Sequence, residues 1–267
     1  MTTSSSKGTA LITGASTGIG AIYAHRLASR GYDLILVSRG QERLNALAQK
    51  IATQTGRKVD TLAADLTVRS ELKQVEARLQ SDSSITALVN NAGFGATASL
   101  IDSNIDEMDN MIQLNVTALT RLTSAILPGF LSRANGLIIN IASIVALDPE
   151  TLNGVYSGTK SFVVNLTQSL HKELQGKGIQ VQVVLPGATS TDFWNRANLP
   201  VKHLPKEIVM SAEEMVDASL AGLDQGELVT IPALPNLADW NAYESARKAL
   251  KPNLSRNHAA ARYGITA

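Results

Sequence analysis

The chain has 267 residues, which suits one α/β domain large enough to bury a sizeable core. Its 24 Lys and Arg residues are interspersed with 23 Asp and Glu residues, so the basic surface that a nucleic-acid-binding protein needs is excluded. Cysteine is absent, which excludes disulfides and thiolate chemistry, and with four scattered His residues we expect no metal site.

The polar, Ser/Thr-rich start of the chain, Met1–Ser6, predicts a flexible N-terminal tail rather than the apolar core of a signal peptide. No apolar run approaches the roughly 18 residues that span a bilayer. The absence of cysteine is compatible with a reducing compartment. We therefore expect a cytoplasmic protein with no membrane span and no nucleic-acid partner.

Short apolar runs alternate with longer segments of helical period along the chain. Runs rich in Val, Ile and Leu predict strands that are buried on both faces. These runs are Gly8–Thr13, Asp33–Val37, Lys58–Ala63, Ala87–Asn90, Gly136–Ala142, Gln180–Leu185 and Leu228–Ile231. The predicted helices are Ile19–Arg30, Gln41–Thr55, Val68–Gln80, Ile105–Leu127, Gly154–Gln175 and Ser211–Leu223. This alternation predicts a Rossmann-type, doubly wound parallel sheet of about seven strands with helices on both faces.

The ends of these helices carry recognisable signals. Gly31 and Gly56 are placed to cap two helices at their C-termini, and the helix from Ile105 is expected to end near Pro128. Ser211 and Glu214 have the spacing of a capping box. We expect a single domain over residues 7–267, with a substrate loop at about 188–211 and a less regular C-terminal segment, 233–267.

A glycine-rich turn, Thr13–Gly20, follows the first predicted strand and opens the first helix. Glycines allow the backbone to approach a ligand closely, and a helix N-terminus attracts the pyrophosphate of a dinucleotide. The same stretch matches the Gly-x-Ser-x-Gly nucleophile elbow of α/β-hydrolases over Gly14–Gly18. Only one strand precedes Ser16, and no later Asp and His stand at strand ends to complete a triad, so we favour dinucleotide binding.

The end of the second strand points to the cofactor. An NAD site usually has a carboxylate there, but Asp33 lies at the start of that strand, at the opposite edge of the sheet. Ser38 and Arg39 stand at its C-terminal end instead, and a hydroxyl beside a guanidinium suits a 2′-phosphate. The sequence therefore predicts NADP, with NAD less favoured.

Four polar residues form a candidate catalytic group. Tyr156 and Lys160 are four residues apart at the start of a predicted helix and so share one face. Ser143 follows the strand Gly136–Ala142, and Asn115 lies within the long helix before that strand. A neighbouring ammonium is expected to lower the pKa of Tyr156 from its usual value near 10.

Over roughly residues 7–232 the chain resembles the short-chain dehydrogenase/reductase family. The matching motifs are Thr13–Gly20, Asp65, Asn90-Asn91-Ala92-Gly93, Asn115, Ser143, Tyr156-x-x-x-Lys160, and Pro186-Gly187 with Thr191. The resemblance implies a catalytic Asn115–Ser143–Tyr156–Lys160 tetrad and a nicotinamide cofactor. It also implies that Asp65 faces the adenine, that Asn91–Gly93 line the cofactor, and that Pro186–Thr191 hold the nicotinamide.

These arguments together give one set of expected cofactor contacts. They are Gly14, Ser16, Thr17, Gly18, Ile19, Gly20, Ser38, Arg39, Asp65, Leu66, Asn91, Ala92, Gly93, Tyr156, Lys160, Pro186, Gly187, Thr189 and Thr191. Within the tetrad, Tyr156 is expected to act as general acid or base, tuned by Lys160, which also reaches the nicotinamide ribose. Ser143 is expected to polarise the substrate oxygen, and Asn115 to position a water linking Lys160 to solvent.

The reaction implied is the interconversion of a ketone or aldehyde and an alcohol by hydride transfer. A non-catalytic NADP-binding sensor or scaffold, and an epimerase or dehydratase on the same fold, stay open as alternatives. The pocket is expected from Gly93–Leu100, Ile144–Asn153 and 188–211. Its side chains Phe94, Ile144, Val145, Leu147, Phe193, Trp194 and Leu199 favour an apolar or weakly polar substrate, unless Arg196, Lys202 or His203 turn inward. Apolar stripes on the predicted helix Ile105–Leu127 and on Ser161–Leu174, within the predicted helix Gly154–Gln175, predict a homodimer or homotetramer.

Overall fold

The computed structural model describes residues 7–197 and 199–265, so the predicted tail Met1–Ser6 lies outside the described residues. The chain forms two compact units, residues 1–232 and 233–267. Among the described residues, no helix is both long enough and apolar enough to cross a bilayer.

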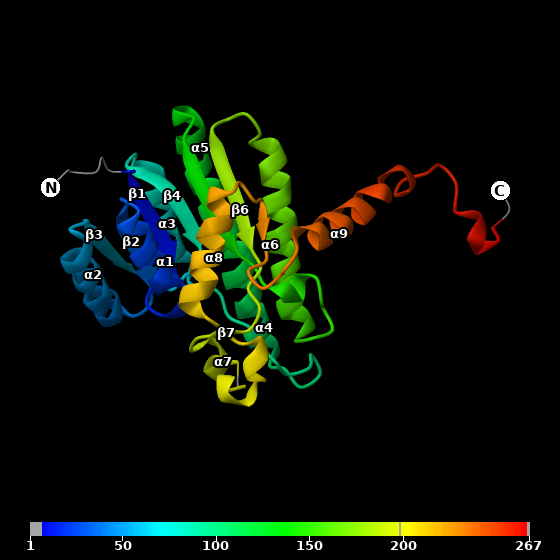
Figure 1. Ribbon diagram of the computed structural model, residues 1–267, viewed down its shortest axis with the longest axis horizontal. Helices are drawn as coiled ribbons and strands as arrows, with labels where there is room; N and C mark the ends of the chain where they lie inside the picture. The colour runs from blue at the N-terminus through cyan, green and yellow to red at the C-terminus, as the bar shows by residue number, and fades with distance from the viewer. Residues whose placement is uncertain (1–6, 198, 266–267) are drawn as a thin grey trace. The chain divides into compact units, whose positions relative to one another are not determined.

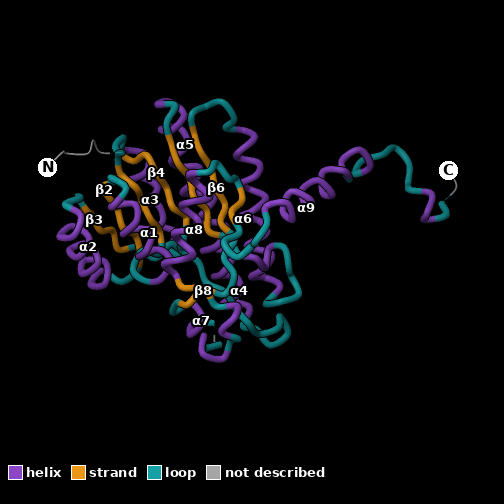
Figure 2. The backbone as a smooth tube through the Cα atoms, viewed as in Figure 1, coloured by secondary structure: helices purple, strands orange, loops and turns teal. Residues whose placement is uncertain are grey.

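A seven-stranded parallel sheet forms the centre of the first unit, in the order β3-β2-β1-β4-β5-β6-β9 (Figures 1 and 2). The strands are β1 (Thr9–Thr13), β2 (Asp33–Ser38), β3 (Val59–Ala63), β4 (Ile85–Asn90), β5 (Gly136–Ile141), β6 (Ile179–Val184) and β9 (Val229–Thr230). Each matches a predicted run to within two residues. The doubly wound sheet predicted from the sequence is confirmed, and its strand order reverses between β1 and β4, where ligands bind in such sheets.

Helices cover both faces of this sheet (Figure 1). One core joins the sheet to α1 (Gly18–Ser29), α2 (Gln41–Thr55) and α8 (Ala212–Asp224). A second core joins the other face to α3 (Arg69–Ser81), α5 (Leu119–Arg133) and α6 (Gly154–Glu173). Because both faces are covered, every residue of β1 and β5 is buried.

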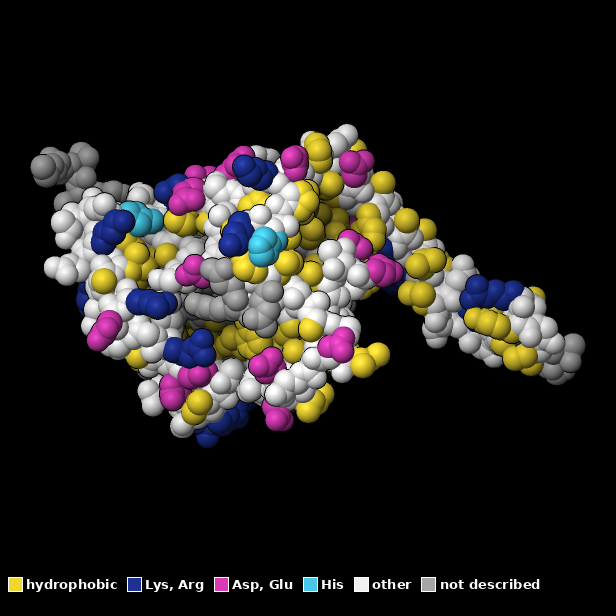
Figure 3. All heavy atoms as spheres, turned by 90° about the horizontal axis from the view of Figure 1, so that it is seen from below, with side chains coloured by type: hydrophobic (Ala, Val, Ile, Leu, Met, Phe, Trp, Pro, Cys, Tyr) yellow, Lys and Arg dark blue, Asp and Glu magenta, His cyan; other side chains and the backbone are white. Residues whose placement is uncertain are grey.

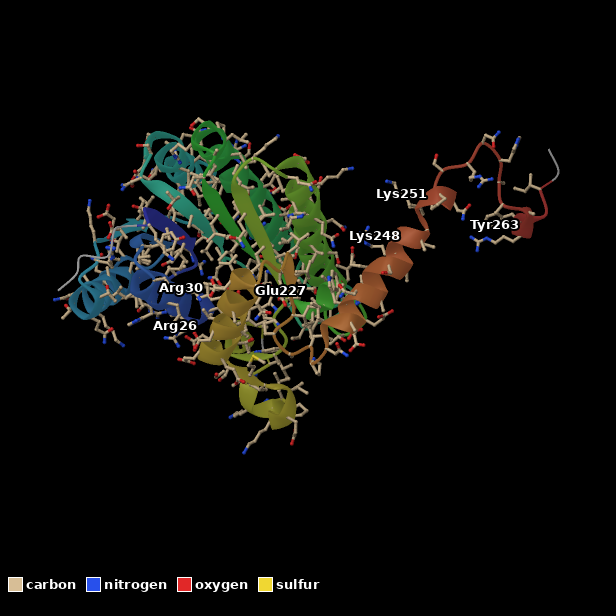
Figure 4. All side chains as sticks on the ribbon, turned by 45° about the horizontal axis from the view of Figure 1, so that its top comes forward. Arg26, Arg30, Glu227, Lys248, Lys251 and Tyr263 are labelled. Atoms are coloured by element: carbon tan, nitrogen blue, oxygen red, sulfur yellow. The ribbon has the colours of Figure 1, made fainter. Side chains whose placement is uncertain are left out.

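Ion pairs tie α1 to α8 along the rim of the first layer. Arg26 Nε lies 2.6 Å from Asp217 Oδ1, and Arg30 Nη2 lies 2.8 Å from Asp224 Oδ2. Figure 4 labels the two arginines on α1. The predicted caps are also present. Gly56 ends α2 in the left-handed conformation at φ 69°, and Ser211 Oγ accepts from Glu214 N at 3.1 Å.

The long helix predicted from Ile105 is continuous but not uniform. It consists of α4 (Ile105–Ile112), a π-helical segment at Gln113–Ala118, and α5, which runs to Arg133. The predicted end near Pro128 is therefore wrong. Pro128 lies on the exposed side of α5, where solvent can satisfy the carbonyl that its missing N–H leaves free. Phe130, fully buried, anchors the following turn in the core.

The segment after β6 folds away from the main sheet. It contains β7 (Thr189–Ser190), the short α7 (Phe193–Arg196), 3₁₀ turns at Val201–His203 and Lys206–Ile208, and β8 (Met210–Ser211). Two short strands, β7 and β8, pair in parallel, and Figure 2 shows β8 apart from the seven-stranded sheet. They close the base of this loop, because Met210 N also donates to Ala188 O at 2.9 Å.

The second unit contains α9 (Leu237–Ala249) and 3₁₀ turns at Lys251–Asn253 and Ala261–Tyr263. Asn236 caps α9 by accepting from Ala238 N at 2.9 Å, and the Trp240 and Tyr243 rings stack at 5.3 Å. Figure 4 labels Lys248, Lys251 and Tyr263 in this unit. The sequence predicts one domain to the C-terminus with an irregular end. Within this segment α9 is a regular 13-residue helix, in which no residue is buried.

Candidate active site

The predicted site residues meet at the carboxyl edge of the sheet, on both sides of the β1/β4 reversal. Each group follows a different parallel strand, so the sheet brings together residues that are far apart in the sequence. The glycine-rich turn follows β1, Arg39 follows β2, Asn91 follows β4, Ser143 follows β5, and Pro186 follows β6.

The glycines of the turn after β1 are packed so tightly that no side chain would fit at their positions. Gly14 and Gly18 have φ values of 64° and 55°, which favour glycine. A Cβ at Gly14 would lie 2.9 Å from Ala92 Cα, and one at Gly20 would lie 2.4 Å from the Gly14 carbonyl oxygen. At Gly18 a Cβ would lie 3.1 Å from Thr191 Cγ2, which brings the turn next to the loop after β6.

Hydrogen bonds from Asn91 and Thr13 hold this turn in place. Asn91 Nδ2 donates to the carbonyl oxygens of Thr13 at 2.9 Å and Gly14 at 3.1 Å. Thr13 Oγ1 accepts from the backbone N–H groups of Asn91 and Ala92, each at 3.0 Å. The side chain of Asn91 thus shapes the turn. Thr13 was not among the predicted site residues, although a threonine that closes a buried strand beside glycines is a usable signal.

The end of β2 offers donors that fit a phosphate. Ser38 Oγ is buried and finds no hydrogen-bond partner among the described residues. Arg39, whose side chain is 72% exposed, places Nη1 3.8 Å from Asp65 Oδ2. Asp33 Oδ1, at the opposite edge, accepts from Lys58 N at 3.1 Å, so its place away from the site is confirmed.

Neighbouring residues complete the predicted cofactor face. Asp65 Oδ1 accepts from the backbone N–H of Thr67 at 2.9 Å and from its hydroxyl at 2.7 Å, which fixes the turn after β3. The side chain of Leu66 is buried in the core. Thr17, the N-cap residue of α1, makes no side-chain capping bond. An uncapped helix start, an unpartnered hydroxyl and an exposed guanidinium form a donor set suited to a phosphorylated dinucleotide.

The first turns of α6 bring Tyr156 and Lys160 together, as their spacing predicts. Both side chains are buried, and Lys160 Nζ lies 5.8 Å from the centroid of the Tyr156 ring. Lys160 Nζ donates to the Ile141 carbonyl oxygen at 3.0 Å, at the end of β5. Ser143, two residues further on, has its hydroxyl hydrogen-bonded to Tyr156.

Asn115 lies in the π-helical segment, and its amide is engaged with protein groups. Its Nδ2 donates to Phe94 O at 2.9 Å and Thr159 Oγ1 at 3.1 Å, and its Oδ1 accepts from Phe94 N at 3.1 Å. A Cβ at Gly93 would lie 2.9 Å from Asn115 Oδ1 and 3.5 Å from Lys160 Nζ, so these three residues are close neighbours. The side-chain amide of Asn115 therefore anchors the backbone of Phe94 close to Lys160.

Burial controls the acid–base properties of this group. Desolvation raises the pKa of Tyr156 to about 12, against the smaller lowering effect of the Ser143 hydrogen bond. Desolvation also lowers the pKa of Lys160 to about 8. The direction for the tyrosine in the chain alone is opposite to the predicted one, because removal from water outweighs the hydrogen bond with Ser143.

Apolar side chains surround Tyr156. The cluster contains Met108, Met111, Val145 and Tyr156, with Phe94, Ala96, Leu152, Val155 and Phe193 packed against it. The Phe193 ring lies 5.8 Å from that of Tyr156, and a Cβ at Gly95 would lie 2.7 Å from Phe193 Cζ. The two methionines of α4 were not predicted. The sequence around them contains no catalytic or ligand-binding residue type that would have marked this helix face as part of a site.

Of the three charged candidates for the pocket, the side chain of Arg196 lies outside the described residues. Lys202 and His203, which were open to turning inward, are exposed, and Leu100, predicted as a pocket residue, is exposed as well. Figure 3 shows the molecule from below, the side on which α4 and α7 lie in Figure 1. Hydrophobic side chains gather in the middle of that face, with acidic and basic ones around them. Within the described part of the chain, no group of three His, Asp or Glu residues is arranged to hold a metal ion.

Comparison with known proteins agrees with this geometry. Residues 8–201 match the family model for short chain dehydrogenases. A short-chain dehydrogenase from Sphingobium yanoikuyae, solved in complex with NADPH, is 46% identical, with a TM-score of 0.92 over 95% of this chain and 98% of that one. A bulky-bulky ketone specific alcohol dehydrogenase from Comamonas testosteroni is 43% identical, with a TM-score of 0.88 over 96% and 98%. Human 17-beta-hydroxysteroid dehydrogenase type 3 is 37% identical over 79% of this chain and 66% of its own length.

Proposed function

The chain belongs to the short-chain dehydrogenase family and is an oxidoreductase acting on alcohol and carbonyl groups, and from that premise we propose that it reduces an apolar ketone or aldehyde with NADPH, using Tyr156 as the proton donor. The observation that carries the proposal is the placement of Tyr156. It is buried beside Ser143 and Lys160, within an apolar cluster, at the edge of the sheet where the glycine-rich turn lies. The reverse reaction oxidises the alcohol through the same groups.

The cofactor supplies the hydride when bound, and the chain holds and orients it. The turn Gly14–Gly20 accommodates the pyrophosphate, since it leads into the N-terminus of α1, whose first N–H groups are not capped by the Thr17 side chain. Ser38 and Arg39 hold the 2′-phosphate, and Asp65 lies next to Arg39 on the adenine side. Lys160 reaches the nicotinamide ribose, and Pro186, Gly187, Thr189 and Thr191 flank the nicotinamide. Ser16, Thr17, Ile19, Ala92 and Gly93 complete the contacts.

Tyr156 protonates the carbonyl oxygen of the substrate as the carbon accepts the hydride. A pKa near 12 keeps its hydroxyl protonated throughout the neutral range, as a proton donor requires. Ser143 donates a hydrogen bond to the same oxygen and stabilises the charge that develops there. Lys160, with a pKa near 8, gains and loses a proton close to neutral pH and so is suited to replace the proton that Tyr156 gives up. Asn115 holds the Phe94 backbone beside them.

Preference for NADPH over NADH follows from the charges at the end of β2. A hydrogen bond to a charged group contributes roughly 1.5–3 kcal/mol, and about 1.4 kcal/mol corresponds to a tenfold change in affinity. One contact from Arg39 is therefore worth about ten- to a hundredfold, less any solvent screening of this exposed side chain.

An apolar or weakly polar substrate is favoured by the cluster around Tyr156. Phe94, Val145 and Phe193 pack with Tyr156 in that cluster. Of the predicted cationic candidates, Lys202 and His203 are exposed, and the side chain of Arg196 lies outside the described residues. An anionic substrate would lose hydration against these apolar side chains. The Comamonas alcohol dehydrogenase, specific for bulky-bulky ketones, supports the same class.

A turnover assay tests the function directly. Purified protein is incubated with NADPH and a panel of aromatic, aliphatic and phosphorylated ketones and aldehydes, and NADPH consumption is followed. We expect turnover of the apolar members only. A non-catalytic sensor or scaffold would bind NADPH without consuming it, and an epimerase or dehydratase would change its substrate with no net loss of NADPH; either result overturns the proposal.

Assembly into a homodimer or homotetramer is part of the proposal. Its sequence argument weakens in the structure, because most of the apolar stripe on α6, including Val163, Leu170 and Leu174, is buried within the chain. Phe162 on α6 and Ile105 and Ile112 on α4 stay exposed and support an intersubunit contact. Light scattering at micromolar concentration tests it, and a monomer would contradict it.

A further inference from the structure

The side chain of Asn153 connects two parts of the candidate active site that are far apart in the sequence, the first turn of α6 and the loop that contains Ala98 and Ser103. It lies at the N-cap of α6, three residues before Tyr156, and is only 2% exposed. Its Oδ1 accepts from the backbone N–H groups of Val155 at 2.9 Å and Tyr156 at 3.3 Å. Its Nδ2 donates to Ala98 O at 2.7 Å and Ser103 Oγ at 3.1 Å. All four hydrogen-bonding positions of the amide are therefore used.

The partners of Nδ2 lie in the loop of residues 96–103, which we call the 96–103 loop. It contains turns but no helix or strand. The backbone of Asn153 adds a bond to Ala96 O at 3.4 Å, and Thr97 Oγ1 ties the far side of the loop to Ala197 O at 2.8 Å. Ala96 packs against the apolar cluster around Tyr156, so the position of the loop affects the packing on one side of that cluster.

We propose that Asn153 is a positioning residue that fastens the 96–103 loop to the first turn of α6, and so fixes the apolar wall of the substrate pocket relative to Tyr156. The inference rests on the proposed function for its catalytic consequence. A helix cap needs only an oxygen acceptor, which Asp, Ser or Thr also provide. The two N–H donors of the amide, aimed at the loop and buried, have a purpose only if the loop must be held.

Substitution with aspartate separates capping from fastening. Asn153→Asp keeps the acceptor for Val155 and Tyr156 but replaces both donors with a carboxylate oxygen that faces the Ala98 carbonyl. We expect kcat/KM for the ketone to fall by about ten- to a hundredfold at pH 8, the range expected when a reacting group is misplaced by about 1 Å. The KM for NADPH should not change, because the cofactor contacts lie elsewhere.

The pH profile gives a readout that capping alone would not move. Burial raises the pKa of a carboxyl group, and the protonated acid can donate to Ala98 O. The loss in Asn153→Asp should therefore shrink as the pH falls towards 5, relative to wild type, whereas the loss in Asn153→Ala should not. Asn104→Asp is the matched control, since Asn104 caps α4 through Asp106 N at 2.9 Å and is exposed; it should behave as wild type. Ser103→Ala removes one acceptor and should give a smaller loss.

Hydrogen exchange tests the fastening independently of turnover. At pH 8, amides of the 96–103 loop should exchange faster in Asn153→Asp than in wild type, while those of Val155 and Tyr156 stay protected; in Asn153→Ala both groups should exchange faster. If the wild-type protein turns over no ketone but this exchange pattern appears, the proposed function fails and the fastening stands. Unchanged loop exchange in Asn153→Asp, or a wild-type kcat/KM at pH 8, would overturn the inference.

Discussion

The two ends of the candidate site handle charge in opposite ways. At the start of α6, Tyr156 and Lys160 are buried, and desolvation raises the pKa of the first to about 12 and lowers that of the second to about 8. At the end of β2, the Arg39 side chain is 72% exposed, and its nearest carboxylate, on Asp65, lies 3.8 Å away. The properties of Tyr156 and Lys160 at the start of α6 depend on the exclusion of water, whereas Arg39 at the end of β2 acts as a charge that is in contact with water.

This difference separates what each end can contribute. Burial shifts the protonation equilibria of Tyr156 and Lys160 by about two powers of ten, so these groups suit proton transfer. Exposed charges are screened and give modest free energies, which suits discrimination between two similar cofactors. Changes at the α6 end should therefore affect the chemical step, and changes at the β2 end should affect which cofactor is used.

Removal of the Tyr156 hydroxyl should have the largest effect. Tyr156→Phe keeps the ring against Phe193 but deletes the proton donor, so we expect kcat to fall by about 10²- to 10⁴-fold with NADPH affinity nearly intact. Steady-state kinetics and NADPH titration by fluorescence measure the two quantities. Near-normal turnover of the purified variant would rule out Tyr156 as the proton donor.

Lys160 should lower stability while it supports catalysis. Its pKa is lowered, so between about pH 8 and 10.5 the unfolded chain binds more protons and the free energy of unfolding rises with pH. Lys160→Met should therefore reduce turnover but make the protein more stable. Its free energy of unfolding at pH 7 should exceed that of wild type by roughly 3 kcal/mol at most. The lost bond to Ile141 O reduces that gain.

Urea denaturation of both proteins from pH 7 to 10 measures this effect. The stability difference should shrink as the pH approaches 10.5, because the lysine is then neutral in the unfolded chain too. The raised pKa of Tyr156 acts above pH 10 in both proteins, where the folded chain keeps a proton that the unfolded chain loses, so stability falls there with rising pH. A variant less stable than wild type at pH 7 would contradict the assigned burial cost.

Changes at the end of β2 should shift cofactor preference by a smaller factor. Arg39→Ala should lower kcat/KM with NADPH by about ten- to a hundredfold and scarcely change it with NADH. Ser38→Asp should move the preference further towards NADH, because a carboxylate repels the 2′-phosphate and accepts from a ribose hydroxyl. The ratio of efficiencies with the two cofactors is the measurement. A wild-type preference for NADH, or an unchanged ratio in Arg39→Ala, would refute the assignment.

Salt should produce the smallest effect, and only at one end. Raising the ionic strength from about 0.1 to 1 M shortens the Debye length from about 10 to 3 Å. The NADPH preference of the wild type should then fall by a few-fold, while kcat at saturating cofactor stays nearly constant. Arg39→Ala, which lacks the screened contact, should lose this salt dependence. A kcat that fell in parallel with the preference would show that the two ends are not independent.

The sequence by itself determined the architecture and the strand ends and helix face on which the candidate site residues stand. Alternating apolar runs specify buried parallel strands, so all seven strands of the sheet were predicted. Spacing alone placed Tyr156 and Lys160 on one helical face, and it placed Ser38 and Arg39 at a strand end. These features are local, because periodicity and strand ends are encoded by residues close together in the chain.

The tertiary structure decided what depends on distant neighbours. The pKa of Tyr156 rises because Met108, Met111 and Phe193, from other elements, exclude water from it, and no local pattern encodes that burial. The helix continues through Pro128 because Phe130 is anchored in the core. Asn153 caps α6, and its two N–H donors find acceptors only because the fold places Ala98 and Ser103 beside it. Burial and long-range hydrogen bonds are properties of the assembled layers, so they appear only in the folded chain.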